Sequence, residues 1–260
     1  MIVAGIDIGS STSKGIVLRG EEILSFVLML TGPQSDRMGD QVLDQALEKI
    51  GLSRKEVRNV VSTGYGRVRV PFSNEIISEI ACHAKGCHFI FPKTKTILDV
   101  GGQDCKAIRV NSKGTHINFV MNDKCAAGTG RFLESMADLL KIELSEMGEV
   151  ALRAKKEAKI DSTCTVFAKS EVVSLMRKGV PKEEILAGLH EAMAVRIFAL
   201  LRLVKVERDF VISGGGAKNK GLVQKIEEKV GMKAFIPDEP QMTGALGAAL
   251  FAWERIRRKA

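Results

Sequence analysis

Two aspartates, Asp7 and Asp99, each end an apolar segment and lead into a short polar turn. The turn residues are Gly9, Ser10, Ser11, Thr12 and Lys14 in the first case, and Gly101, Gly102, Gln103, Asp104 and Lys106 in the second. Glycines let backbone N–H groups approach an anion, hydroxyl groups donate hydrogen bonds to it, and a lysine offsets its charge. A carboxylate at the same point can hold Mg²⁺ through its water shell. These residue types favour phosphate and magnesium binding, although one such turn alone is also typical of an ordinary hairpin.

The two turns are copies of one repeat. The segment GIDIGSSTSKGIVL, which begins at Gly5, aligns with ILDVGGQDCKAIRV at a constant offset of 92 residues. Two copies can bind a polyphosphate from both sides, so we expect both aspartates to hold magnesium and Lys14 to offset charge on the outer phosphates. Lys106 fits either the same role or a solvated position on a strand. Gln103 or Asp104 is the candidate for orienting the water that attacks the phosphate.

A third glycine turn, VISGGGAKN, begins at Val211. The segment FVISGGGA aligns with NVVSTGYG at an offset of 151, so the second copy holds 59 more residues than the first between these landmarks. Successive glycines let a base or ribose lie against the backbone, although a turn followed by a helix N-cap explains the motif equally well. The nucleotide contacts expected in this part of the chain are Gly214, Gly215, Gly216, Asn219, Gln241 and Gly244.

Two cysteines lie in the extra residues of the second copy, each before a helical run. Cys125 stands in NDKCAAGTGRFLE and Cys164 in DSTCTVFAKSEVVSLM, where Asp161, Ser162 and Thr163 are available as helix caps. A thiolate at a helix N-terminus is stabilised by unpaired N–H groups and the positive end of the helix dipole. The alternative is that both are small apolar residues packed near helix starts.

A metal site needs more thiolates than these two cysteines supply. Iron–sulfur clusters usually take four thiolates, structural zinc takes four ligands, and the chain has no CxxC motif. A symmetric dimer would supply Cys125 and Cys164 twice, so the pair fits a cluster shared across a two-fold axis. The other cysteines, Cys82, Cys87 and Cys105, are expected to pack, because the first two lie on different faces of a predicted helix.

Two similar α/β halves are needed to position these residues. Apolar alternation and 3.6-residue periodicity predict strands at about 2–8, 14–19, 23–30 and 58–62 and helices at 36–50 and 75–86 in the first half. The second half is predicted to hold strands at 96–100, 105–110, 116–121, 209–213 and 233–236, several helices after 121, and helices at 219–229 and 242–258. We therefore expect a first nucleotide-binding subdomain at 1–92 and a second at 93–241 with an insertion at about 121–180. A C-terminal helix at 242–260 is expected to return to the first subdomain.

Composition excludes several classes of protein. The 260 residues carry a net charge of +8, are 45% hydrophobic and only 5% aromatic, and contain no uninterrupted apolar run long enough to cross a membrane. The first residues are typical of a strand and turn rather than a signal peptide. Five cysteines without close pairing argue against a disulfide scaffold and for a reducing cytoplasm. Basic and acidic residues alternate, which favours a solvated surface over nucleic-acid binding and leaves an acidic protein partner open.

The two Asp-Gly turns and the late GGG turn resemble the nucleotide-binding fold shared by actin, the Hsp70 chaperones and the sugar kinases such as hexokinase, a ribonuclease H-like architecture. The resemblance spans the whole chain. It implies an α/β protein of two related subdomains that bind ATP in a cleft between them, with the cysteine-bearing segment as a helical insertion.

The motifs NDKCAAGTGRFLE, STCTVFAKSEV, DVGGQDCK and GALGAAL are similar to those of the ATP-dependent activators of 2-hydroxyacyl-CoA dehydratases. The resemblance implies a homodimer with one 4Fe–4S cluster bound by Cys125 and Cys164 of each subunit. Such a dimer would take an electron from ferredoxin or flavodoxin and pass it, coupled to ATP hydrolysis and Mg²⁺, to a dehydratase. An ATPase subunit of a benzoyl-CoA reductase, a small-molecule kinase, and a zinc-bridged or cluster-free regulatory ATPase are the alternatives.

Overall fold

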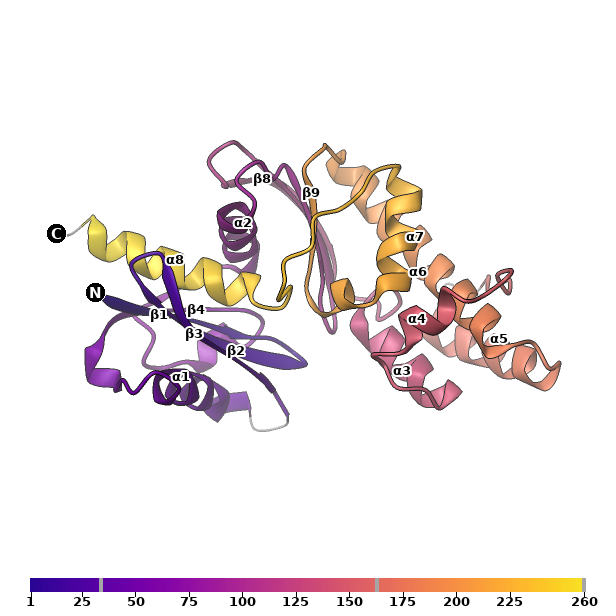
Figure 1. Cartoon of the computed structure of the whole chain (residues 1–260), viewed down its shortest axis with the longest axis horizontal. Helices are drawn as coiled ribbons and strands as arrows, with labels where there is room; N and C mark the ends of the chain where they lie inside the picture. Colours follow the sequence, from indigo (N-terminus) through magenta and orange to yellow (C-terminus); the bar gives the residue numbers. More distant parts are fainter. Residues whose placement is uncertain (33–34, 162–163, 259–260) are drawn as a thin grey trace. The chain divides into compact units, whose positions relative to one another are not determined.

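Strands whose residues are buried on both faces form the middle of a five-stranded sheet in the order β3-β2-β1-β4-β5 (Figure 1). Its strands are β1 (Ile2–Ile8), β2 (Thr12–Arg19), β3 (Glu22–Leu30), β4 (Val57–Thr63) and β5 (Glu75–Ile76). The β1–β2 and β2–β3 pairs are antiparallel, whereas β4 runs parallel to β1 and to β5. The computed structural model describes residues 1–32, 35–161 and 164–258. The sheet belongs to the first of two units, formed by Met1–Thr94, Val110–Ile117 and Pro237–Ala260.

Helices cover both faces of this sheet. Helix α1 (Met38–Glu48) packs on the face that carries Ala4, Ile6 and Ile8, and helices α2 (Glu79–Ile90) and α8 (Thr243–Arg257) pack on the face that carries Val3. Short 3₁₀ turns lie at Ser35–Arg37, Arg54–Glu56 and Arg67–Arg69. The small residues of GALGAAL serve close packing here, because a Cβ added to Gly247 would lie 1.8 Å from the carbonyl oxygen of Cys82 on α2.

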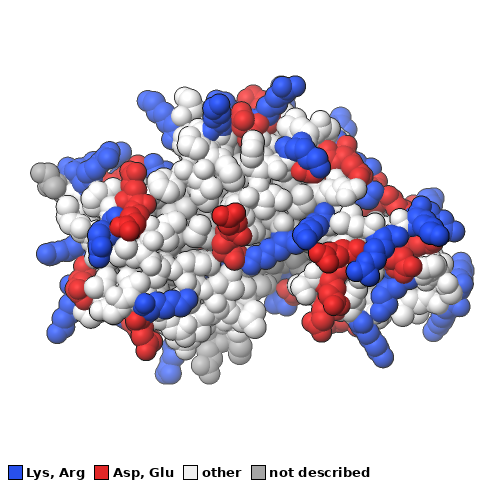
Figure 2. All heavy atoms as spheres, in the orientation of Figure 1, with Lys and Arg blue, Asp and Glu red and all other residues white. Residues whose placement is uncertain are grey.

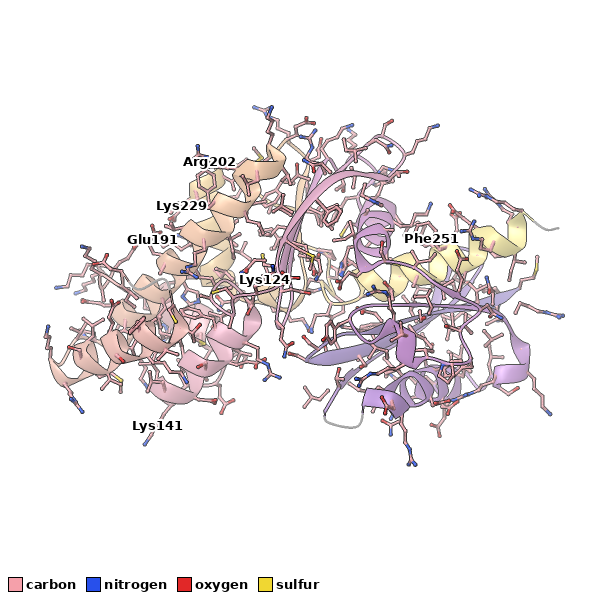
Figure 3. The ribbon with its side chains drawn as sticks, turned by 180° about the vertical axis from the view of Figure 1, so that it is seen from behind. Lys124, Lys141, Glu191, Arg202, Lys229 and Phe251 are labelled. Atoms are coloured by element: carbon pink, nitrogen blue, oxygen red, sulfur yellow. The ribbon has the colours of Figure 1, made fainter. Side chains whose placement is uncertain are left out.

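The second unit, Lys95–Arg109 and Asn118–Ile236, contains a four-stranded sheet in the order β8-β7-β6-β9. Its strands are β6 (Thr96–Val100), β7 (Cys105–Val110), β8 (His116–Asn122) and β9 (Phe210–Ser213). The helices are α3 (Gly130–Leu140), α4 (Met147–Ala151), α5 (Thr165–Arg177), α6 (Lys182–Val204) and α7 (Lys220–Val230), with a 3₁₀ turn at Gly215–Lys218. Helix α6 contributes many of the buried apolar side chains of this unit. Its Glu191 forms an ion pair with Lys229 of α7 (Figure 3).

Two predicted elements are wrong in detail. Residues 75–86 are not one helix, because Glu75–Ile76 pair with β4 and α2 begins after Ser78, whose Oγ accepts the Ala81 N–H at 3.3 Å. The strand expected at 233–236 is reduced to a single bridge between Val211 and Phe235. The mixed α/β class expected from the sequence is confirmed.

The sheet registers correct the second repeat by one residue. Asp7 pairs with Lys14 and Thr63, and Asp99 pairs with Lys106 and Ser213. The structural offset between β4 and β9 is therefore 150 rather than 151, and the extra segment holds 58 rather than 59 residues. The sequence comparison misses this because it matched identical residues, such as Ser62 with Ser213, whereas backbone pairing makes Thr63 the equivalent of Ser213.

Charged side chains of both signs are mixed on the face drawn in Figure 2. Many form ion pairs, such as Arg255 with Glu75 at 2.7 Å and Lys220 with Glu149 at 2.9 Å. This mixing of both signs is typical of a solvated surface. Within the described ranges, every helix is too short or too polar to cross a lipid bilayer.

Candidate functional site

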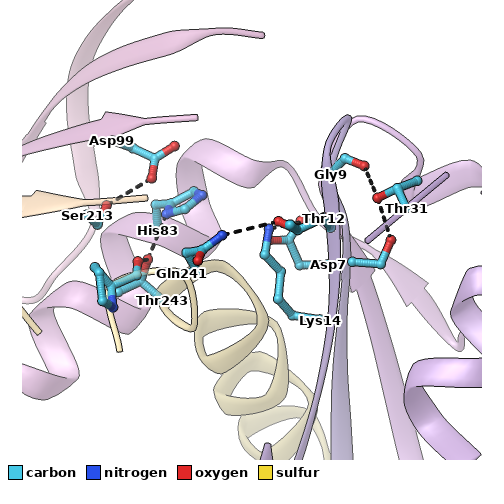
Figure 4. A network of polar contacts seen from close by, with 12 residues as sticks. Asp7, Gly9, Thr12, Lys14, Thr31, His83, Asp99, Ser213, Gln241 and Thr243 are labelled. Carbon is cyan, nitrogen blue, oxygen red and sulfur yellow. Dashed lines mark hydrogen bonds and ion pairs between the residues drawn. The ribbon is translucent and has the colours of Figure 1, made fainter. Parts of the chain in front are cut away.

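The first phosphate turn is built around a buried ion pair. Lys14 lies opposite Asp7 in the β1–β2 register, and its Nζ is 3.3 Å from Asp7 Oδ2 (Figure 4). The same Nζ donates to the Thr12 carbonyl at 3.2 Å, and Gly9 N–H donates to that carbonyl at 3.0 Å. A side chain at position 9 would meet the Thr12 oxygen at 2.7 Å, so the turn requires glycine. The ends of β1 and β2 thus bring the Lys14 ammonium and the Asp7 carboxylate together beside the turn.

Thr31, which sequence reasoning missed, fixes the shape of this turn. Its Oγ1 donates to the Gly9 carbonyl at 2.8 Å, so the Ser13 hydroxyl donates to Thr31 Oγ1 at 2.9 Å. Its N–H donates to the Ser11 carbonyl at 2.9 Å. The one sequence signal is its place at the end of the predicted strand 23–30. Ser10 and Ser11 are half-buried in the turn.

The start of α8 lies beside the first turn. Gln241 Nε2 donates to Thr12 Oγ1 at 3.4 Å. A Cβ at Gly244 would lie 2.9 Å from Asp7 Oδ2 and 3.2 Å from His83 Nε2, so the helix start approaches the carboxylate closely. His83, in turn, shares a hydrogen bond with Thr243 Oγ1 at 3.0 Å. The positive end of the α8 dipole therefore faces Asp7.

The second turn repeats the ion pair with an added carboxylate. Lys106 Nζ lies 3.3 Å from Asp99 Oδ2 and 2.6 Å from Asp104 Oδ1, and Ser213 Oγ donates to Asp99 Oδ1 at 3.0 Å. Gly101 N–H donates to the Asp104 carbonyl at 3.0 Å, as Gly9 does in the first turn. Lys106 is 2% exposed, which excludes the solvated alternative. Two carboxylates hold its charge inside the unit.

Around this turn, Gln103 is exposed and Gly102 is half-buried. Cys105 is fully buried, and burial raises the pKa of its thiol. The packing role expected for this cysteine fits its place in the core.

Each aspartate is also covered by a glycine with positive φ. Gly64 has φ +87° and its added Cβ would lie 2.3 Å from Asp7 Oδ1, while Gly214 has φ +80° and its added Cβ would lie 2.8 Å from Asp99 Oδ1. A side chain at either position would be strained and would displace the carboxylate. Beyond Gly214, Gly215 is exposed and Gly216 is buried.

Asn219 is used inside the second unit. Its Oδ1 accepts the Leu222 N–H at 2.9 Å and caps α7, and its Nδ2 donates to His190 Nε2 at 2.9 Å. This geometry favours the capping interpretation of the motif over ligand contact. Burial lowers the pKa of His190 to about 4, although a hydrogen bond to the Leu186 backbone acts in the opposite direction.

The segment around Cys125 is an exposed loop tied to the second turn. Asn122 Nδ2 donates to the Cys125 carbonyl at 3.0 Å, and Asn122 Oδ1 accepts the Cys125 N–H at 3.3 Å. The sequence predicted that the first N–H groups of α3 would stabilise the Cys125 thiolate. Instead, Gly130 N–H donates to the Gly101 carbonyl and Arg131 N–H donates to the Gly102 carbonyl, both at 2.8 Å. The second turn is therefore joined by main-chain hydrogen bonds to the start of α3, the helix that follows the cysteine loop.

Cys164 is the N-cap residue of α5, in agreement with its expected place at a helix start. Its proposed capping neighbours, Ser162 and Thr163, lie outside the described residues.

The cysteines separate into two classes by exposure. Cys125 and Cys164 are exposed, whereas Cys82, Cys87 and Cys105 are buried. Burial raises the pKa of the Cys82 thiol to about 12, which opposes the thiolate form that metals bind. Among the described residues, no three metal-ligating side chains come together in one chain. One chain therefore offers two exposed thiols, half of the set that a cluster or a structural zinc requires.

Comparisons with known proteins identify the family to which the chain is similar. Residues 4–252 match the model of the BadF/BadG/BcrA/BcrD ATPase family. The chain is 43% identical over 258 residues to the 2-hydroxyisocaproyl-CoA dehydratase activator of Clostridioides difficile, covering 99% of this chain and 97% of the relative. It is 45% identical over 261 residues to the activator of lactoyl-CoA dehydratase of Anaerotignum propionicum, covering 100% of both chains.

Solved structures give the same result. The chain superimposes on the activator of the 2-hydroxyisocaproyl-CoA dehydratase from Clostridium difficile with bound ADPNP, with a TM-score of 0.94, 42% identity, and 100% and 97% of the two chains covered. A ROK family glucokinase from Streptomyces griseus shares only 13% identity at a TM-score of 0.62, over 98% and 100% of the chains. That distant likeness shows the fold alone, which is the expected ATPase fold of the sugar kinases.

Proposed function

The chain belongs to the BadF/BadG/BcrA/BcrD ATPase family, and from this premise we propose that it is an ATP-hydrolysing activator of a 2-hydroxyacyl-CoA dehydratase. In this proposal a homodimer passes one low-potential electron to the dehydratase and couples the transfer to ATP hydrolysis. Its support is whole-chain similarity to two proteins named as such activators. A ferredoxin or flavodoxin is the proposed electron donor.

Nucleotide binding rests on the two turns. ADPNP is bound in the similar structure from Clostridium difficile. We expect the backbone of Gly9 and Gly101 to approach the phosphates and Lys14 to offset their charge. Asp7 and Asp99 would hold Mg²⁺ through its waters, and the ion would offset the charge that develops during phosphoryl transfer.

Gln103 is the better of the two candidates for orienting the attacking water. Asp104 already forms an ion pair with Lys106 at 2.6 Å, whereas the Gln103 side chain is exposed at the tip of the turn. An amide can accept one hydrogen bond from a water and donate another to a phosphate oxygen. This assignment predicts that removing the Gln103 amide lowers hydrolysis more than nucleotide binding.

The two exposed cysteines fit a shared 4Fe–4S cluster. Four thiolates are required, one chain offers Cys125 and Cys164, and a two-fold axis doubles that number. When bound there, such a cluster supplies a one-electron carrier at the surface of the second unit. Asn122 holds the Cys125 loop in place through three hydrogen bonds, at 3.0 and 3.3 Å to Cys125 and at 3.2 Å to the Ala127 carbonyl.

The observation that carries the proposal is the main-chain connection between the second turn and α3. Carbonyls of Gly101 and Gly102 accept hydrogen bonds at 2.8 Å from the first residues of the helix that follows the Cys125 loop. We infer that a displacement of this turn by nucleotide would move the start of α3 and, through it, the cysteine loop that precedes this helix. An activator needs this coupling, whereas a small-molecule kinase has no use for it.

Anaerobic purification followed by an electron-transfer assay tests the proposal. We expect a brown dimer with about four irons per dimer, and ATP-dependent reduction of a 2-hydroxyacyl-CoA dehydratase when a reduced ferredoxin is supplied. Cys125→Ala and Cys164→Ala should each lose iron and activity, whereas the matched control Cys87→Ala, at a buried position, should keep both. A colourless monomer that phosphorylates a small molecule would overturn the proposal, and zinc in place of iron would favour a zinc-bridged ATPase.

A further inference from the structure

A cation lies next to one of the two exposed thiols. Arg196 of α6 points its Nη1 at Cys125 Sγ, and the two atoms are 3.7 Å apart. Arg196 is half-buried; Met193, one turn before it on α6, and Ile197, the next residue, are both buried in the core of the second unit. The guanidinium therefore projects from a rigid helix toward the loop.

The loop is shaped to allow this contact. Gly128 has φ +96°, and a Cβ there would lie 3.9 Å from the Cβ of Arg196, so the chain passes close over the base of the arginine. Asn122 fixes the Cys125 backbone from the other side through its 3.0 Å and 3.3 Å hydrogen bonds. Asn122 thus positions Cys125, and the loop at Gly128 packs close to Arg196.

An apolar cavity adjoins the same pair. It has a volume of about 320 Å³ and is lined by Cys125 and Arg196 together with Ala127, Ile197, Leu200 and Leu203, among others. The pocket is partly open to solvent, but its lining is mostly apolar, so the pair is screened less than it would be in bulk water.

We propose that Arg196 sets the reduction potential of the cluster bound through Cys125. The proposal rests on the function proposed above. A positive charge and an N–H donor beside a ligand sulfur both stabilise the more negative, reduced state, and hydrogen bonds to the sulfurs are a known determinant of cluster potential. Arg196 thereby makes the cluster easier for the electron donor to reduce. The potential that it sets also determines by how much ATP hydrolysis must lower the cluster potential before the electron passes to the dehydratase.

Potentiometric titration of the anaerobic holoprotein, followed by electron paramagnetic resonance, tests this role. Arg196→Gln should shift the midpoint potential to a more negative value. At the wild-type midpoint the ratio of reduced to oxidised cluster should fall about tenfold, which corresponds to about 59 mV for one electron. Arg196→Lys keeps the charge but not the planar donor, so it should recover part of the shift.

Arg202→Gln is the matched control. Arg202 lies on the same helix, is exposed, and has the same charge, so this variant changes the net charge equally without touching Cys125 (Figure 3). Its midpoint potential should equal that of the wild type. Equal potentials for Arg196→Gln and Arg202→Gln at equal iron content would overturn the proposal and leave the proposed function intact.

Loss of the cluster is also informative. If Arg196→Gln binds no iron, the comparison passes to Arg196→Met against Arg202→Met, which both remove the charge and the donor, and identical potentials for that pair would overturn the role of Arg196. Absence of iron from the wild-type protein would instead overturn the proposed function itself. The two failures are therefore distinguishable by iron content alone.

Discussion

Asp7 and Asp99 are held in the same way, each by a cross-strand lysine and a glycine with positive φ. Lys14 and Lys106 lie 3.3 Å from their aspartates, and Gly64 and Gly214 leave no room for a side chain at the carboxylates. A buried carboxylate is stable as an anion only with such a partner. Both units thus pair a carboxylate at the end of an inner strand with a lysine from the neighbouring strand.

Removal of the lysine should destabilise the second unit. Lys106→Met leaves Asp99, which is 2% exposed, without its cation, so we expect the free energy of unfolding to fall by about 3 kcal/mol. Urea denaturation without Mg²⁺, monitored by circular dichroism, measures the change. Lys113→Met, at an exposed position, is the control and should have little effect. Unchanged stability of the Lys106 variant would mean that Asp99 is neutral or hydrated in the folded protein.

His190 predicts a dependence of stability on pH. Burial holds its pKa at about 4 in the folded protein, below the ordinary value of 6.5, so the unfolded chain takes up a proton first as the pH falls. The contribution of neutral His190 to the free energy of unfolding is complete above about pH 6.5 and is lost as the pH falls toward 4. By pH 5 the loss of stability amounts to about 2 kcal/mol.

The comparison variant is His190→Gln, which can still accept the Asn219 hydrogen bond but does not titrate. Denaturation of both proteins between pH 7 and pH 5 should show the wild type losing more stability than the variant. Parallel pH profiles would contradict a buried neutral His190.

At the scale of elements, the sequence predicts the strands and turns whose formation depends on neighbouring residues. The bounds of β1 and β6 follow from apolar runs, which are buried almost throughout, and the repeat locates both turns because strand, aspartate and glycine occur together. The start of α2 does not follow from periodicity, since the Ser78 cap and the pairing of residues 75–76 with β4 decide it. Thr31, His83 and Arg196 are absent from any local motif. Their contacts join segments far apart in sequence, so only the folded chain brings them to the site.

Packing of α8 against α2 depends on glycine. An alanine at position 247 would place its Cβ 1.8 Å from the Cys82 carbonyl oxygen, so the two helices would have to separate. We expect Gly247→Ala to lower the free energy of unfolding by about 2–3 kcal/mol, as overpacking of a rigid contact does. Thermal unfolding measures the loss, with Arg257→Ala at an exposed position of α8 as control. A variant as stable as the wild type would show that the helix pair can shift without cost.

At the scale of the whole molecule, the proposed cluster site is incomplete in a single chain. Its two exposed cysteines supply half of a four-thiolate set, and the described residues bring no third metal ligand to them. The proposed function therefore requires a second copy of the chain, and the oligomeric state becomes part of the chemistry rather than a detail of assembly.

Mixed dimers provide the sharpest test of this requirement. A Cys125→Ala, Cys164→Ala double variant of different mass, co-expressed with the wild type, contributes no thiolate to the shared site. A wild-type dimer has four ligands, a mixed dimer has two, and two thiolates do not hold a 4Fe–4S cluster. Anaerobic native mass spectrometry should therefore find the cluster in dimers of two wild-type chains only. In the control, a co-expressed Cys87→Ala chain should form mixed dimers that retain it, because Cys87 is buried. A cluster in a mixed dimer with the double variant, or in a wild-type monomer, would contradict sharing, since either species would have assembled four ligands without the second pair of cysteines.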